Sequence, residues 1–130
     1  IVDDGAGLRT TGNWFCVEKR DGETEWRLST RNGTATTTTL SRTTAGVAND
    51  QNTWQTIEIF VHDYDGGTNV QVTAMVDGVF LRDTTDDNLV IRHTRLIASA
   101  TEMSAWLGVK NGGANNELLY ADYVFAGQTR

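Results

Sequence analysis

The chain has 130 residues, a net charge of −6 and 13 glycines but no proline. Its isoelectric point near 4.7 argues against a nucleic-acid-binding protein, which needs a basic patch. The simplest explanation of the acidic composition is that it keeps the protein soluble. The length predicts one domain, which buries roughly 68% of the surface that its unfolded chain exposes. We expect no signal peptide and no membrane span, because no apolar run approaches the ~18 residues that a span needs.

The turns and the cysteine content set further limits. Glycine, asparagine and aspartate must supply the turns, because the chain has no proline. The single cysteine, Cys16, excludes an internal disulfide. It lies in a strand-like run, which favours a small buried core residue over a nucleophile. The polar, abrupt start at residues 1–4 predicts either a trimmed start or a domain cut from a longer protein.

The first part of the chain predicts short strands joined by turns. Residues 1–12 hold few large apolar side chains and predict a short strand at best. Alternation of apolar and polar residues then predicts strands at residues 14–19, 24–30 and 35–40. The Asn32-Gly33 pair predicts a tight hairpin before the third strand. That strand is a run of threonines, which favours an edge position, and residues 41–53 predict a loop.

The centre of the chain carries the clearest periodicity. Residues 54–61 and 69–76 alternate with a period of two, which fits strands with one buried face and does not fit a helix. A turn with glycines separates them at residues 63–67. Asp77-Gly78 is a strong hairpin signal, and residues 79–81 follow it as an apolar run. We therefore predict an antiparallel meander of three strands.

The last part predicts further short strands between polar loops. Strands are expected at residues 89–91, 96–98, 103–109 and 118–125. Residues 82–88 and 110–116 predict loops, and residues 99–102 predict a turn or a single helical turn. The whole pattern amounts to about nine or ten short strands with almost no helix, which is typical of an all-β antiparallel β-sandwich or barrel.

Several stretches resemble a known superfamily. The central strands carry the pattern Trp54-x-x-Ile57-x-Ile59-x-Val61, a turn, then Val70-x-Val72-x-x-x-Val76-Asp77-Gly78. This pattern resembles the concanavalin A-like and laminin-G-like jelly-roll domains. Residues 26–33 and 119–130 look like such domains in tailed-phage structural proteins, where the domain decorates a capsid or forms part of a fibre or spike. The resemblance covers most of the chain from residue 14 onward and implies a jelly-roll β-sandwich. The family's first strand is poorly represented in residues 1–12.

Candidate catalytic carboxylates are few. Glucanases of the concanavalin A-like superfamily carry three carboxylates on one strand. Alternation along that strand points all three side chains into the cleft. Glu58 and Asp63 are the nearest approach here, but they are out of phase, and Phe60 stands in place of the middle carboxylate. We therefore expect no catalytic residues and no enzyme activity.

A calcium site is one alternative for the polar loops. Lectins of the resembling fold often hold Ca²⁺ through loop carboxylates and carbonyls. With His62 and His93 as possible neighbours, the candidate ligands are Asp63, Asp65, Asp86 and Asp87. Their spacing matches no recognisable calcium loop, and ordinary turn chemistry is the simpler explanation.

A sugar site is the other alternative. Trp26, Trp54 and Trp106 share apolar runs or open them, which predicts core packing. Trp14 lies near the exposed start, where its ring would be free to stack on a sugar. The remaining candidate ligand-binding residues are in the loop at 110–116: Asn111, Asn115 and Asn116.

Two functions from different classes follow. The first is a non-enzymatic structural module of a phage virion, in capsid decoration or in a tail fibre or spike. It would bind other virion proteins or its own copies in a symmetric oligomer, and host glycans on its outer face. The second is a carbohydrate-binding, lectin-like module that is secreted. A glycan-degrading enzyme is a distant third, and no cofactor is expected apart from the Ca²⁺ considered above.

Overall fold

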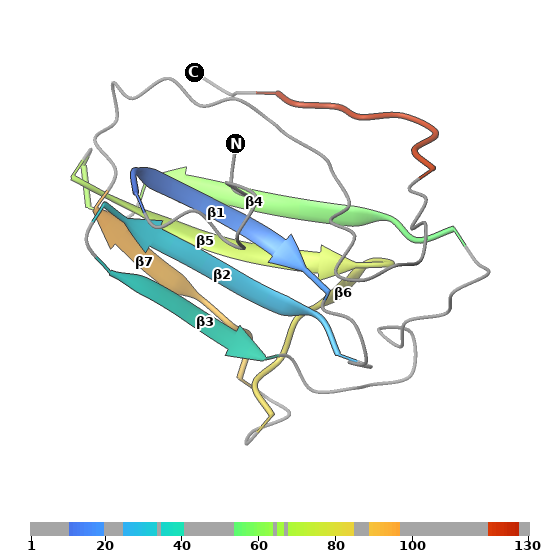
Figure 1. The fold of residues 1–130 in the computed structure, drawn as a ribbon, viewed down its shortest axis with the longest axis horizontal. Coiled ribbons are helices and arrows are strands. Elements are labelled where there is room, and N and C mark those ends of the chain that lie inside the picture. Colours follow the sequence, from blue (N-terminus) through green and yellow to red (C-terminus); the bar gives the residue numbers. More distant parts are fainter. Residues whose placement is uncertain are drawn as a thin grey trace, which may run out of the picture.

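A computed structural model describes residues 11–19, 25–33, 35–40, 54–63, 65–66, 68–84, 89–96 and 120–127. Across these ranges the chain forms antiparallel β-sheets and no helix, as the periodicity predicts (Figure 1). The described part accordingly holds no helix long and apolar enough to cross a membrane. The prediction of an all-β antiparallel fold is confirmed.

The first sheet has three strands in sequence order. They are β1 (Asn13–Glu18), β2 (Arg27–Asn32) and β3 (Thr36–Leu40), with β2 in the middle. The predicted Asn32-Gly33 turn joins β2 to β3. Gly33 has a φ of +84°, and the Asn32 side chain accepts a 3.0 Å hydrogen bond from the backbone N–H of Ala35. The threonine-rich β3 lies at the end of the strand order, as predicted.

The second sheet is built on β5 (Asn69–Val76). Strand β4 (Ile57–Asp63) pairs with one edge of β5 along its whole length. The other edge of β5 pairs with β6 (Val79–Phe80) at one end and with β7 (His93–Leu96) at the other. The predicted three-stranded meander is therefore confirmed. Its Asp77-Gly78 turn has positive φ at both residues, 52° and 75°, which suits a two-residue hairpin of this twist.

Strands β6 and β7 are two parts of one interrupted edge. Leu81 N–H continues the β6 pairing by donating to Ala74 C=O at 3.0 Å. The chain then leaves β5 as a small excursion, closed by a bridge between Arg82 and Val90 and by a 2.9 Å bond from Ile91 N–H to Leu81 C=O. It rejoins β5 where His93 lies opposite Val72. Residues 82–84 and 89–91 are thus the two described ends of an insertion in an otherwise continuous strand.

The two sheets face each other across one apolar layer, with the first sheet over the second in Figure 1. Three inward side chains of β5, those of Val72, Ala74 and Val76, are completely buried. Six buried residues form the core, contributed by β2, β5 and the two ends of the excursion: Leu28, Val72, Ala74, Val76, Leu81 and Ile91. Phe15 and Val17 of β1 pack against it from the first sheet. This sandwich-like arrangement explains the alternation in the central strands.

One buried polar contact links the sheets. Thr30 on β2 is fully buried, and His93 on β7 is only 5% exposed. Thr30 Oγ1 and His93 Nδ1 share a 2.9 Å hydrogen bond between strands of different sheets. A buried polar group is costly without a partner, so this bond favours one alignment of the sheets over others.

Some sequence predictions were wrong in their details. Strand β4 begins at Ile57 rather than at residue 54, and Trp54, predicted to be in the core, is 72% exposed. β7 includes His93, which was expected between strands, and begins before the predicted 96–98. Cys16 is partly exposed, because its neighbours Phe15 and Val17 take the inward positions of β1.

The end of the described chain also differs from expectation. Residues 120–127, the described part of the predicted strand 118–125 and the two residues after it, form no strand. Their large side chains are strongly exposed, with Phe125 at 85%. Alternation alone predicted a strand, but a strand also needs a partner edge, which the pattern does not supply. The predictions for residues 1–10, 41–53, 99–102, 103–109 and 110–116 lie outside the described residues.

Replacing Thr30 by valine tests the link between the sheets. Thr30→Val keeps the shape and removes the hydroxyl, so His93 Nδ1 loses this buried hydrogen bond. We expect the free energy of unfolding to fall by about 1–3 kcal/mol, measured by urea denaturation. Thr37→Val is the matched control, because Thr37 lies opposite Thr30 on β3 but is exposed. Its expected change is within about 0.5 kcal/mol. Equal effects of both changes would contradict this role for Thr30.

Candidate interaction surface on strand β4

Strand β4 lies at the end of the strand order in the second sheet, and among the described residues it pairs with β5 alone (Figure 1). The direction of its backbone groups follows from one bond at its start. Asp77 N–H donates to Thr56 C=O at 2.8 Å, one step before the Ile57–Val76 pair. Hydrogen-bonded and non-hydrogen-bonded pairs alternate along an antiparallel ladder. The residues that direct their N–H and C=O groups away from β5 are therefore Ile57, Ile59, Val61 and Asp63.

The start of β4 is held in place by the β5–β6 turn. Asp77 accepts hydrogen bonds through its two carboxylate oxygens, from Thr56 N–H at 2.8 Å and from Gln55 Nε2 at 3.1 Å. Together with the bond from Asp77 N–H, these contacts attach the chain before β4 to the turn after β5. The position of the outer edge of β4 is therefore set by the hairpin that joins β5 to β6.

Several large apolar side chains of β4 are exposed, although such side chains are usually buried. Ile57, Ile59 and Phe60 are 40%, 38% and 41% exposed, and Trp54 just before the strand is 72% exposed. The two isoleucines lie on the core side of the sheet, whereas Phe60 lies on the outer side, where its ring centroid is 6.2 Å from that of Phe80. Both faces of one edge strand are thus partly apolar and accessible. Exposed apolar area on an open strand edge is typical of a protein-binding surface.

The predicted calcium ligands divide into two groups. Asp86 and Asp87 lie outside the described residues. Asp63 is the last residue of β4 and Asp65 lies in the loop from β4 to β5, and each makes a turn contact. Asp63 accepts a 3.2 Å bond from Asp65 N–H, and Asp65 accepts from the backbone and side-chain nitrogens of Asn69. The described residues contain no group of three histidine, cysteine, aspartate or glutamate side chains arranged to hold a metal.

The loop contacts change the acidity of Asp65. The hydrogen bond from the Asn69 side chain, helped by that from the Asn69 backbone N–H, lowers the pKa of the Asp65 carboxyl below 3.8. Both bonds favour the ionised carboxylate, because a carboxylate accepts hydrogen bonds more strongly than a carboxylic acid does. Asp65 therefore acts in this structure as the residue that closes the β4–β5 loop.

The predicted sugar-binding residues are not brought together. Trp14 is only 7% exposed, so its ring does not offer the open stacking face that was expected of it. Alternation places it on the side of β1 opposite the core residues Phe15 and Val17, and that side is covered as well. The other three candidates, Asn111, Asn115 and Asn116, lie outside the described residues. Trp54, which was predicted to be buried, is the exposed tryptophan in the described part.

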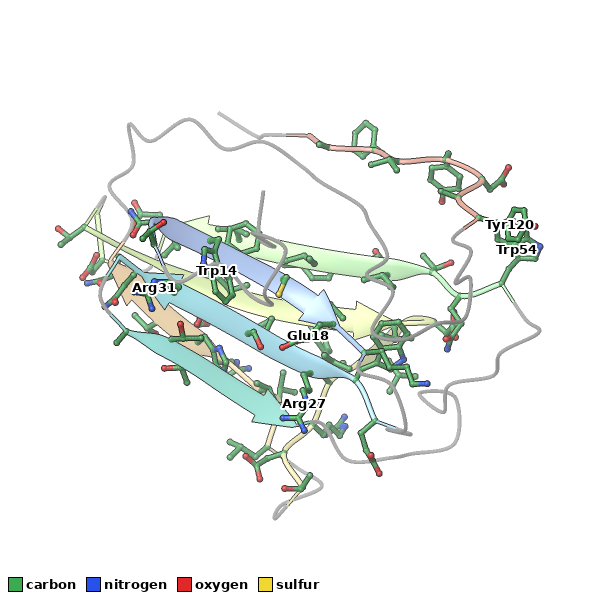
Figure 2. The ribbon with its side chains drawn as sticks, viewed as in Figure 1. Trp14, Glu18, Arg27, Arg31, Trp54 and Tyr120 are labelled. Carbon is green, nitrogen blue, oxygen red and sulfur yellow. The ribbon has the colours of Figure 1, made fainter. Side chains whose placement is uncertain are left out.

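A polar row on β1 and β2 shares the side of the sheet on which Trp14 lies. Figure 2 labels Glu18 on β1 and Arg27 and Arg31 on β2 in this row. Glu18 accepts a 2.7 Å hydrogen bond from Ser29 Oγ. Arg31 donates to Thr36 Oγ1 at 2.9 Å and to a backbone carbonyl at 3.1 Å. These contacts cross between neighbouring strands, so they support the first sheet.

A small cavity lies at the excursion. It has a volume of about 190 Å³ and is lined by residues 83 and 89–93. Sites for small organic ligands usually occupy about 300–1,000 Å³. The histidine in its lining, His93, is the one that binds Thr30 across the sheets. The cavity is therefore small, and its histidine already has a structural role.

The remaining chemical candidates are far apart in the strand geometry. Glu58 and Asp63 lie on opposite faces of β4, since they are five positions apart in a strand with a period of two. His62 lies on the exposed outer face of β4 and shares a 3.1 Å hydrogen bond with Gln71, whereas His93 is buried on β7. The two histidines therefore do not share a site.

The comparisons with known proteins supply no relative. No protein-family model, curated protein or solved structure matches the chain. The function must therefore be argued from the fold and from the exposed edge of β4.

Acid titration tests the role of Asp65. Its folded-state pKa is lowered, so its stabilising contribution is complete above the unfolded value of 3.8 and is lost as the pH falls through the lower folded-state value. We expect the urea midpoint of the wild type to fall more than that of Asp65→Asn between about pH 6 and pH 2.5. Asp122→Asn, at an exposed carboxylate outside any strand, is the control and should keep the wild-type difference. Parallel curves for Asp65→Asn and the wild type would contradict this role.

Proposed function

We propose that the chain is a non-enzymatic structural module of a tailed-phage virion, with a jelly-roll β-sandwich fold, that works by binding other proteins through β4. The observation that carries the proposal is the exposure of Ile57, Ile59 and Phe60 on an edge strand. Exposed apolar edge strands promote pairing with other chains, and monomeric proteins usually avoid or protect them. An exposed apolar edge strand in this chain is consistent with a partner protein that covers it.

The composition of β4 favours assembly over catalysis. The candidate carboxylates Glu58 and Asp63 lie on opposite faces, so they would not act together on one bound substrate. Ile57, Ile59 and Phe60 instead expose apolar and aromatic surface, and aromatic residues are enriched in the centres of protein interfaces. The virion assignment itself is supported by the resemblance of residues 26–33 and 119–130 to tailed-phage structural domains.

Photo-crosslinking in particles tests the proposal. Phe60 is replaced by benzoylphenylalanine in cells that produce the virus, and the released particles are banded on a density gradient. We expect the chain in the particle band, with ultraviolet-dependent crosslinks to a virion protein or to a second copy. Thr37→benzoylphenylalanine, on the edge strand β3, is the matched control and should crosslink much less.

Two results would overturn the proposal. One is the presence of the chain in the cell lysate but not in the particle band. The other is equal crosslinking from the substituted Thr37 and Phe60 within particles, because this would mean that β4 is no preferred contact. Crosslinks from Phe60 alone would assign the interface to β4 and identify the partner by mass.

A second candidate function is carbohydrate binding, favoured by the surroundings of Trp54. Its ring is 72% exposed, and the next residue, Gln55, is held by Asp77. An open aromatic face beside fixed polar groups is typical of sugar sites. A glycan array, run with Ca²⁺ and again with chelator, tests it with the wild type and Trp54→Ala. We expect specific signals to fall at least about tenfold in Trp54→Ala, in line with the loss of a central aromatic contact. An unchanged array pattern would exclude Trp54 as the site.

A further inference from the structure

We propose that two copies of the chain join their β4 strands antiparallel about a two-fold axis centred on Phe60, forming one continuous sheet across the dimer. This inference rests on the proposed function, since it names the partner of the β4 surface as a second copy. Among the described residues no strand pairs with the outer edge of β4, which directs backbone donors and acceptors away from β5, and its exposed side chains are self-complementary in one register. That complementarity selects a second copy over an unrelated partner.

The backbone geometry permits this pairing. Ile57, Ile59 and Val61 direct their N–H and C=O groups outward, as the bond from Asp77 N–H to Thr56 C=O establishes. Centring the axis on Phe60 places Ile59 opposite Val61 of the second copy, and both have outward groups to exchange. Phe60 then lies opposite its own copy as a non-hydrogen-bonded pair, in which side chains come closest. All seven residues of β4 find an opposite residue.

The side chains match in the same register. On the outer face, Glu58 lies opposite His62 of the second copy, an acidic residue opposite a basic one, and symmetry makes this pair twice. Between the two pairs, the Phe60 rings meet at the axis. On the core side, Ile59 meets Val61, so the apolar layer continues from one copy to the next. Cross-strand pairs of opposite charge, of aromatic rings and of β-branched residues each stabilise a sheet.

Other registers lose this match. Centring the axis on Glu58 puts the two Glu58 carboxylates opposite each other, and like charges in directly opposite positions destabilise a sheet. Centring it on Ile59 leaves Glu58 opposite Phe60, and centring it on Val61 leaves His62 opposite Phe60. Both shifts also leave residues of the seven-residue strand without an opposite residue. The register centred on Phe60 is the one that places Glu58 opposite His62 and uses the full strand.

Cysteine crosslinking tests the register. In a Cys16→Ser background, Phe60→Cys should form an intermolecular disulfide under oxidised glutathione, because opposite residues of a non-hydrogen-bonded pair have Cα atoms about 4.5 Å apart, within disulfide range. Glu58→Cys alone and His62→Cys alone should not, since each is displaced from its own copy. A mixture of these two variants should crosslink. Disulfides from Glu58→Cys alone, with none from Phe60→Cys, would overturn the register.

Charge substitution tests the affinity by sedimentation equilibrium. E58K places a lysine opposite His62, and H62E places a glutamate opposite Glu58, so each variant alone should dimerise at least about tenfold more weakly than the wild type. Mixing E58K with H62E restores opposite charges in both pairs and should restore the dimer. D122K makes the same charge change as E58K outside the strands and is the matched control. Equal weakening by D122K, or no recovery in the mixture, would overturn the pairing.

The outcomes separate this inference from the proposed function. A wild-type chain that stays monomeric at its highest soluble concentration, but crosslinks from Phe60 to another virion protein in particles, overturns the two-fold pairing and keeps the structural role. A dimer with the predicted crosslinks, formed by a chain that is missing from particles, supports the pairing and overturns the virion assignment.

Discussion

The fold depends on the pairing of β5 on both of its edges. Its inward side chains, Val72, Ala74 and Val76, are fully buried because strands on either side and the first sheet above exclude water from them. Burying apolar surface stabilises by roughly 25 cal/mol per Å², so the complete burial of these three side chains stabilises the fold. β4 and β7 take their positions from β5. The buried bond between Thr30 and His93 then aligns the first sheet on the second.

Local signals in the sequence predicted the parts of the fold that local chemistry decides. Asp77-Gly78 predicted the β5–β6 hairpin, because few residues other than glycine, asparagine and aspartate adopt positive φ readily, and both residues do so here. Alternation predicted β5 with its exact bounds as residues 69–76. What alternation could not predict was which strands share an edge. The joining of β6 and β7 along β5 depends on contacts between residues distant in sequence, and residues 120–127 show that a pattern without a partner edge does not form a strand.

The candidate surface was harder to predict than the fold. Trp14 and Trp54 look alike in the sequence, yet the first is covered and the second is open, because exposure depends on what the rest of the chain places above each ring. Asp63 and Asp65 were both predicted to lie in a turn, but Asp63 ends β4 and Asp65 follows it; their hydrogen bonds are turn contacts that composition cannot distinguish from metal ligation. The symmetry of residues 57–63 about Phe60 was present in the sequence. It becomes meaningful only once β4 is known to be an edge strand with outward backbone groups.

The pairing of strands on β5 does not depend on the length of the excursion between Leu81 and His93. Its neck is closed by the bond between Ile91 and Leu81, and both side chains are buried in the core. The strand after the neck therefore resumes on β5 without regard to how many residues lie beyond it. Because the entropy of closing a loop grows only slowly with its length, this position can accept insertions at small cost. Diversity, whether natural or introduced as a displayed peptide, can accumulate there while the paired strands stay unchanged.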